Sequence, residues 1–548
     1  MMINIKKKQS KQDETSFQKA QVLFSQHKYK QAEEIIASLI EQKNNNAEHL
    51  YFMARIKEHR GLYTEQIEFL HKALVITPRS SEFLIKIALA QLKLGHFSES
   101  FQYANMAKSN LDNTIEIWEL LGNIYHELGK YTESAMAYKN ALELSNNDPQ
   151  LFYRYGTALT LSGNIKESIE AYQQAIKINP SFGLAYAAIS KARKATVNDN
   201  NIEQLKLLVN EDRNPWTGIN LYHGLAKEFD DLGQYTEAFN VLEKGKKRLR
   251  TSCPHSPIAG AENIRALTTL YNKQANEIND TSAAFTSTGS TNEGSTKAPI
   301  FVTGMPRTGT TIVERILTNS PTVMAIGERI QFSTMLKQQC LKNYAGLVDA
   351  QVLEEVWTSI DFEQLGNDYI ESVQYLTHNQ HRFVDKLPLN ILLAGAILRA
   401  LPQAKIICLM RDPLDTIIGN YRQIFEQKSG TYAHTLELNA LASFVYEFRE
   451  LANNLQQLFG ERFMIVNYET LVEEPLIKAK EIYQFCQLHW DDAFIDIHKN
   501  TATIGTASAA QVQEPIHKKS LGHAQNYHFC LDQFKVAFES KHSPEEKA

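Results

Sequence analysis

Apolar and small residues recur with a fixed period through the first third of the chain. One glycine in each period is followed two positions later by a large apolar residue, such as Tyr63 or Phe97. The glycines, spaced 34 residues apart, are Gly61, Gly95, Gly129 and Gly163. Small residues keep the same spacing in two further series, which begin at Ala20 and Ala73. Because small residues let helices cross closely and glycine permits a tight turn, the pattern predicts stacked helical hairpins.

This period, and the positions of its small residues, resemble the tetratricopeptide repeat, with about five units over residues 12–181. Stacked copies bury a continuous core that one copy could not form, so the resemblance implies an α-solenoid. Residues 217–250 repeat the pattern loosely, which predicts a further helical, degenerate repeat region over 182–278. Such arrays either bind a substrate or partner on a concave face or act as spacers, and both interpretations stay open.

The composition changes after the repeats. Residues 279–298 are rich in serine, threonine and glycine, which predicts a flexible loop or linker. Beyond it, over residues 299–540, apolar strands alternate with helical runs. The predicted strands cover 300–303, 383–386, 405–410 and 462–468. This alternation predicts an α/β domain with a parallel sheet.

The first of these strands leads into a glycine turn at residues 304–309, and an amphipathic helix follows. Backbone N–H groups of such a turn, with the positive end of the helix behind them, bind phosphate-like anions. The spacing from Gly304 to Gly309 is that of the nucleotide P-loop, but Thr310 replaces the lysine that the P-loop requires. Arg307 is the only cation in the loop. The loop therefore fits a donor with one phosphate and a further anionic group better than a nucleoside triphosphate.

Four polar residues stand at or just after the predicted strands. They are Arg307, Lys386, Arg411 and Tyr468. Ligands of parallel α/β sheets bind beyond the carboxyl ends of the strands. We therefore expect these four side chains to point into one crevice.

Five ordered motifs make this domain resemble a known family. The motifs are FVTGMPRTGTT (301–311), GERI (327–330), DKLPLN (385–390), KIICLMRDPLD (405–415) and VNYETLV (466–472). They resemble bacterial sulfotransferases that carry a tetratricopeptide array and, more distantly, tyrosylprotein sulfotransferases. The resemblance implies an N-terminal tetratricopeptide α-solenoid followed by a P-loop-like α/β sulfotransferase domain with a parallel sheet. It also implies 3′-phosphoadenosine 5′-phosphosulfate as the donor and a hydroxyl group as the acceptor.

The same resemblance implies which residues bind the donor. The loop that would hold the 5′-phosphosulfate consists of Arg307, Thr308, Gly309, Thr310 and Thr311. Arg411 would hold the 3′-phosphate, and Tyr468 and Ser508 would contact the donor. Structural alternatives remain open, since Arg411 can pair with Asp412 at a helix start. Likewise, Tyr468 can be a core residue and Ser508 an ordinary loop serine.

Catalytic roles for Glu328, Lys386 and Arg307 are implied in the same way. Glu328 matches the base that accepts the hydroxyl proton, and a positioned base accelerates transfer by roughly 10²–10⁴. Lys386 matches the lysine that stabilises charge developing on the leaving phosphate oxygen. The alternatives are a solvated glutamate beside Arg329 and a lysine at the edge of the sheet.

Two departures from the family pattern concern the donor. Gly419 stands where the family usually has a serine that shares the 3′-phosphate, and His523 with Ala524 stands where it has a basic residue and tryptophan. We expect weaker donor affinity, or a 3′-phosphate contact shifted to Asn420 or Lys518.

Composition narrows the class of protein. The 548 residues are 43% hydrophobic and 22% charged, as in ordinary globular domains. A net charge of −5 argues against binding to nucleic acid, and no apolar run approaches the roughly 20 residues of a membrane helix. The five cysteines lack CxxC spacing, which predicts reduced thiols in the cytoplasm and no bound metal.

Three classes of function compete at this stage. The first is sulfuryl transfer to a hydroxyl acceptor, which can be a peptide tyrosine presented by the array, a carbohydrate or a small phenol. The second is nucleotide phosphate chemistry, which the absent P-loop lysine disfavours. The third is a scaffold with a degenerate transferase domain, which Gly419 and His523 keep open. We expect the array, residues 12–181, to serve acceptor capture, so that deleting it preserves donor affinity.

Overall fold

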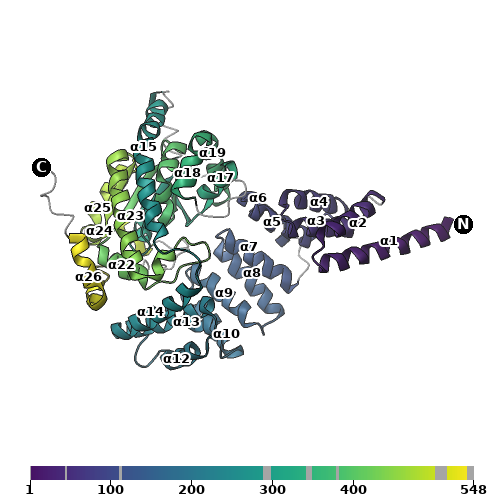
Figure 1. Cartoon of the computed structure of the whole chain (residues 1–548), viewed down its shortest axis with the longest axis horizontal. Coiled ribbons are helices and arrows are strands. Elements are labelled where there is room, and N and C mark those ends of the chain that lie inside the picture. Colours follow the sequence, from purple (N-terminus) through teal and green to yellow (C-terminus); the bar gives the residue numbers. More distant parts are fainter. Residues whose placement is uncertain are drawn as a thin grey trace. The chain divides into compact units, whose positions relative to one another are not determined.

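The computed structural model describes residues 2–42, 46–109, 114–287, 298–340, 348–377, 382–499 and 515–539 (Figure 1). By packing, the chain divides into two compact units, Met1–Asn146 and Asn147–Ala548, which we name unit 1 and unit 2. The division falls inside the repeat region rather than at the predicted linker. Unit 2 therefore contains the last helices of the repeat region together with the α/β domain.

Unit 1 consists of helical hairpins. Its helices are α1 (Met2–Ser25), α2 (Tyr29–Gln42), α3 (Ala47–His59), α4 (Tyr63–Ile76), α5 (Ser81–Lys93), α6 (Phe97–Ser109), α7 (Ile115–Glu127) and α8 (Tyr131–Leu144). The turn glycines of the period have positive φ angles, for example 71° at Gly61 and 77° at Gly95, as the sequence pattern requires. A Cβ on Gly122 would lie 2.5 Å from the ring of Tyr138, so a small residue is needed where the two helices cross. The predicted solenoid is confirmed.

The repeat geometry continues into unit 2. The helices there are α9 (Pro149–Leu161), α10 (Ile165–Ile178), α11 (Gly183–Ala192), α12 (Ile202–Glu211), α13 (Pro215–Asp231), α14 (Tyr235–Ser252) and α15 (Ala259–Ser287). Gly163 and Gly233 again make the turns, with φ angles of 90° and 76°. The long helix α15 covers residues 279–287, so the first part of the range predicted as a linker is helical. Residues 288–297 lie outside the described part of the chain.

The α/β domain is built on a five-stranded parallel sheet. Its strands are β1 (Ile300–Gly304), β2 (Val323–Gly327), β3 (Arg382–Lys386), β4 (Lys405–Met410) and β5 (Phe463–Asn467), in the order β2-β3-β1-β4-β5. Ile300 of the central strand lies opposite Val384 on one side and Lys405 on the other. The four predicted strands are present. The sequence pattern did not reveal β2, a strand at the edge of the sheet in which Val323 and Ile326 are buried and the other three residues are half-buried.

Helices cover both faces of this sheet. Val302 of β1 packs with Val313 of α16 on one face, whereas Phe301 packs with Phe332 and Tyr369 on the other. The helices of the domain are α16 (Thr310–Thr318), α17 (Gln331–Cys340), α18 (Ala350–Val356), α19 (Phe362–Ser372), α20 (Gln374–Thr377), α21 (Ala394–Ala400), α22 (Pro413–Tyr421), α23 (Leu438–Phe459), α24 (Tyr468–Glu473), α25 (Pro475–Phe485) and α26 (His528–Glu539). Short 3₁₀ turns include η4 (Ala433–Leu436) and η8 (His523–Tyr527). Helix α15 packs against α18 and α23 (Figure 1). It also packs against α21, and α14 packs against η4 and η8.

The described helices can also be judged by whether they could cross a membrane. None of them combines enough length with enough apolar character to cross a lipid bilayer.

Candidate functional site

A cavity of about 830 Å³ lies within unit 2, beyond the carboxyl ends of β1, β4 and β5. Its α/β wall includes Arg307, Gly309, Thr310, Thr311, Arg411, Gly419 and Tyr468. Its opposite wall comes from the repeat region and includes Tyr153, Thr157, Tyr172, Lys191 and His223. Six of the residues implied to bind the donor therefore face one cavity. Because α9 and α10 form part of its wall, deleting residues 12–181 would open the cavity, and the expectation that donor affinity survives this deletion does not fit the structure.

The loop after β1 is shaped by tight backbone packing. Gly304 has a φ of 150°, and a Cβ there would lie 2.8 Å from the carbonyl oxygen of Leu409. Gly309 has a φ of 97°, and a Cβ there would lie 2.5 Å from the ring of Tyr468. Thr308 is buried and donates its hydroxyl to the carbonyl of Met305, 2.7 Å away. Both glycines and Thr308 thus hold the loop in place beneath Tyr468.

Helix α16 begins directly after this loop and points its N-terminus at the cavity. Thr310 and Thr311 are its first two residues, and both line the cavity. The first N–H groups of a helix have no partner within the helix, and the helix dipole adds partial positive charge there. The loop and the start of α16 together suit an anion such as a phosphate or phosphosulfate.

Three arginines concentrate positive charge around the loop. Burial, together with the charges of Arg422 and Arg411, lowers the pKa of Arg307 to about 10. The guanidinium of Arg411 lies over the ring of Tyr468, 4.6 Å from its centroid, and donates to the carbonyl of Arg307 at 3.2 Å. Mutual repulsion in a buried position is relieved by a bound anion, so this charge arrangement favours an anionic ligand.

The predicted pairing of Arg411 with Asp412 is replaced by a pair with Asp415. Asp415 lies one helical turn further along, and its Oδ2 accepts from Arg411 at 2.9 Å. The same carboxylate accepts from the backbone N–H groups of Gly522 at 3.0 Å and Ala524 at 2.7 Å. Arg411 also donates to the carbonyl of Ser520. Asp415 thereby ties the C-terminal segment to the cavity wall, and its i,i+4 spacing from Arg411 was a signal available in the sequence.

Gly419 and Asn420 differ in where they lie relative to the cavity. Gly419 lines the cavity, and a Cβ on it would meet only the Cβ of Arg307, at 3.5 Å. Asn420 is fully buried and donates its amide hydrogens to the carbonyls of Pro306 at 2.8 Å and Thr416 at 2.9 Å. The predicted phosphate contact through Asn420 is therefore replaced by a role in holding the loop, because both donors are already used. Lys518 is exposed and is not among the described residues that line the cavity.

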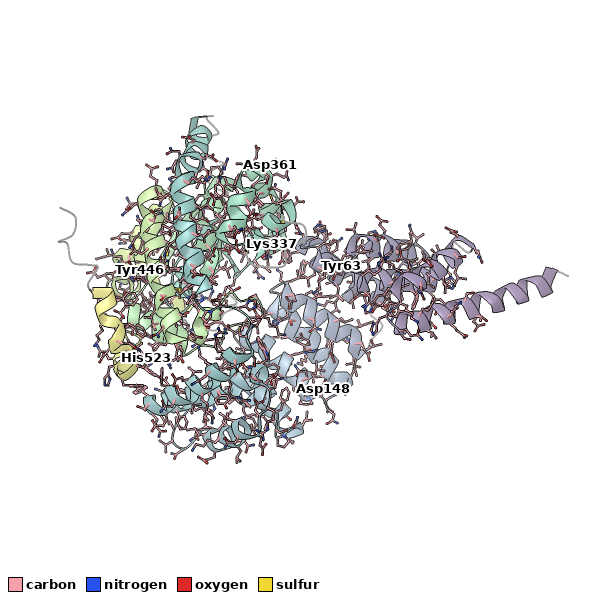
Figure 2. All side chains as sticks on the ribbon, viewed as in Figure 1. Tyr63, Asp148, Lys337, Asp361, Tyr446 and His523 are labelled. Carbon is pink, nitrogen blue, oxygen red and sulfur yellow. The ribbon has the colours of Figure 1, made fainter. Side chains whose placement is uncertain are left out.

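A polar network at the cavity rim joins the repeat region to the α/β domain. Asp230, at the end of α13, accepts hydrogen bonds from Arg422 and from the hydroxyl of Tyr527. Arg422 also donates to Nε2 of His523 at 2.6 Å (His523 is labelled in Figure 2). Burial alone would raise the pKa of Asp230, but the contact with His523 and the charge of Arg422 lower it. No local sequence pattern indicates this network, since its members are far apart in the chain.

Glu328 and Lys386 form a separate pair at the ends of β2 and β3. The Oε1 atom of Glu328 lies 2.5 Å from the Nζ atom of Lys386. The lysine side chain is 1% exposed and the glutamate side chain 39% exposed. Neither is among the described residues that line the cavity. Of the four polar side chains expected to share one crevice, three therefore line the cavity and Lys386 does not.

Buried acids surround this pair. Burial raises the pKa of Glu314 on α16, and Glu328 raises it further while Lys386 lowers it. Burial also raises the pKa of Asp385 to about 7, although Tyr369 donates to its carboxylate at 2.7 Å. Lys386 is therefore buried close to several acidic groups. Among them, Glu328 is its hydrogen-bond partner and the one that is exposed to solvent.

Two expectations remain, one about Ser508 and one about a metal ion. Ser508 lies outside the described residues. Within the described ranges, no group of three or more histidine, cysteine, aspartate or glutamate side chains is placed to hold a metal ion.

Comparisons with known proteins agree with this geometry. Residues 299–492 match the model of the sulfotransferase family, and residues 122–162 and 149–182 match tetratricopeptide repeat models. An uncharacterized protein of Aquifex aeolicus is 27% identical over 462 residues, which are 82% of this chain and 58% of that protein.

Some of the curated relatives carry sulfotransferase names. A protein-tyrosine sulfotransferase of Drosophila melanogaster is 23% identical over 215 residues, covering 36% of this chain and 39% of that protein. Carbohydrate sulfotransferase 1 of Danio rerio is 32% identical over 118 residues, covering 19% of this chain and 28% of that protein. The chain thus spans 58% or less of the length of these curated relatives.

Proposed function

Because the chain joins tetratricopeptide repeats to a sulfotransferase-family domain, we propose that it transfers a sulfuryl group from 3′-phosphoadenosine 5′-phosphosulfate to a hydroxyl acceptor. The observation that carries this proposal is the buried, positively charged cavity at the start of α16, in which the loop lacks a P-loop lysine. A donor with two separate anionic ends fits such a site. The loop around Arg307 accommodates one end, and the wall beyond Arg411 accommodates the other.

The residues at the loop bind and orient the donor. Arg307 and the first N–H groups of α16 would hold the 5′-phosphosulfate, where preorganised donors stabilise the charge that develops during transfer. Tyr468 packs against the loop, as the close approach of its ring to Gly309 indicates. These contacts need no divalent metal, because arginine and backbone N–H groups supply the positive potential.

Transfer forms a bond from the acceptor oxygen to sulfur and breaks the bond from sulfur to the 5′-phosphate oxygen. The acceptor proton passes to the carboxylate of Glu328, and Lys386 stabilises the negative charge left on the phosphate. The close contact of these two side chains supports both roles, because it places the proposed base beside the group that is proposed to stabilise the leaving oxygen. Exposure of Glu328 leaves it open to an acceptor arriving from solvent.

The acceptor is proposed to be a hydroxyl of a protein, a carbohydrate or a small molecule. The described residues that line the cavity all belong to unit 2. We propose that unit 1 captures the acceptor.

Binding of adenosine 3′,5′-bisphosphate tests the proposed function, because this nucleotide is the product of the donor. We expect calorimetry to detect binding in the presence of EDTA, and Arg307→Ala to weaken it about tenfold to a hundredfold. A hydrogen bond to a charged oxygen contributes about 1.5–3 kcal/mol. Arg79→Ala removes an exposed arginine in unit 1 and should leave affinity unchanged. Binding of ADP with magnesium in place of the bisphosphate would contradict the proposal and favour nucleotide phosphate chemistry.

Gly419→Ser should tighten binding of the same bisphosphate. The space beside Gly419 accepts a Cβ at ordinary contact distance, and the new hydroxyl can donate to the 3′-phosphate. A neutral hydrogen bond contributes about 0.5–1.5 kcal/mol, which corresponds to an improvement of about two- to tenfold. Affinity for adenosine 5′-monophosphate, measured in parallel, should not change. An equal gain for both nucleotides would mean that serine merely stabilises α22.

A further inference from the structure

Lys191 differs from the paired cations of the cavity wall. Lys227 forms an ion pair with Asp231, Arg193 pairs with Asp199, and Arg422 pairs with Asp230. Lys191 lies in the last turn of α11 and lines the same cavity. It makes no hydrogen bond or ion pair with any residue in the described ranges, so its charge is available to a ligand.

Protein atoms surround Lys191, but no described residue supplies a counter-charge to it. Burial lowers the pKa of Lys191 to about 8, so the ammonium stays protonated at pH 7. His223 beside it offers no compensation, because burial and the charge of Lys191 hold the pKa of His223 well below its usual value. The side chain is nevertheless exposed within the open cavity, so an anion that enters the cavity can reach the ammonium without displacing a protein partner.

The wall around α22 has few donors left for a second phosphate. Gly419 has no hydroxyl, and Asn420 uses both amide hydrogens on backbone carbonyls. Arg411 spends three hydrogen bonds on Arg307, Asp415 and Ser520. Apart from Nε of Arg411, which has no partner, the described wall around α22 therefore offers few unused side-chain donors to a 3′-phosphate.

Lys191 lies near this part of the wall. His223, which is close enough to feel the charge of Lys191, also makes a hydrogen bond with the backbone of Arg422 at the end of α22. The chain of neighbours therefore runs from Lys191 through His223 to the helix that carries Gly419. Phosphate is the anion that the donor would bring to this place.

We propose that Lys191 binds the 3′-phosphate of the donor nucleotide, so that a helix of the repeat region completes the nucleotide site. This inference rests on the proposed function. It gives the repeat region a role in donor binding, in addition to any role in acceptor capture. It also explains how a chain with Gly419 can bind the 3′-phosphate.

The test compares two nucleotides on the full-length chain by calorimetry. We expect Lys191→Ala to weaken adenosine 3′,5′-bisphosphate about tenfold to a hundredfold and to leave adenosine 5′-monophosphate unchanged. Lys191→Arg should restore most of the affinity, because it keeps the charge. The control Lys177→Ala, which removes an exposed lysine of α10 outside the described cavity lining, should have no effect.

Other outcomes separate this inference from the proposed function. If the unaltered protein binds the bisphosphate but Lys191→Ala does so equally well, the inference is wrong and the proposed function stands. Equal losses for both nucleotides would place Lys191 elsewhere on the nucleotide and also overturn the inference. If the unaltered protein does not bind the bisphosphate, the proposed function fails first.

Discussion

Glu328→Gln is expected to lower the rate of sulfuryl transfer by roughly 10²–10⁴ while donor affinity stays unchanged. Glutamine has nearly the same size as glutamate, and its carbonyl oxygen can still accept the hydrogen bond that Lys386 donates at 2.5 Å. It cannot accept the acceptor proton at neutral pH. The measurement is kcat with radiolabelled donor and an acceptor identified from a cell lysate, alongside calorimetry with adenosine 3′,5′-bisphosphate.

Two further variants serve as comparisons for Glu328→Gln. Glu328→Asp keeps a carboxylate on a shorter side chain and should retain more activity than glutamine. Glu473→Gln alters an exposed glutamate on α24 and should leave kcat unchanged. A rate for Glu328→Gln close to that of the unaltered protein would show that another group accepts the proton. Loss of donor binding in the same variant would instead assign Glu328 to the donor site.

The parts of the fold that the sequence predicted are those encoded by local patterns. The positive φ angles at Gly61 and Gly95 follow from a repeat period that can be read residue by residue. The loop after β1 was likewise predicted from Gly304, Gly309 and the apolar strand before them, and both glycines have the positive φ angles that such a turn needs. Strand β2 was missed although its residues form a short apolar run, because a run of five apolar residues does not by itself distinguish a strand from a buried helical segment.

The details of the site depend on contacts between distant segments, which no local pattern encodes. Asn420 was predicted to face the phosphate because it follows Gly419, but the loop carbonyl of Pro306 holds its amide instead. The pair of Arg422 with Asp230 joins two helices from different parts of unit 2. The repeat region was treated as a separate domain, so its contribution of a cavity wall, including Lys191, could not be foreseen.

Asp415→Ala is expected to destabilise unit 2 more than any surface substitution. Asp415 is buried and accepts from Arg411 and from the N–H groups of Gly522 and Ala524. Alanine would leave a largely buried guanidinium and two N–H groups without their acceptor. Removing one partner of a buried ion pair costs about 3–5 kcal/mol in the free energy of unfolding. Thermal and urea unfolding of the full-length chain would measure this loss.

The same substitution should also weaken binding of the bisphosphate, because Arg411 loses one of the contacts that hold it against Tyr468. Asp415→Asn keeps a carbonyl acceptor but no charge, so its effects on unfolding and binding should be intermediate. The control Asp532→Ala breaks an exposed pair with Lys535 on α26, and such pairs contribute about 0–1 kcal/mol. If Asp415→Ala unfolds like this control yet still loses the nucleotide, Asp415 serves to orient Arg411 for binding and contributes little to stability. If neither property changes, the carboxylate does not hold the C-terminal segment in place.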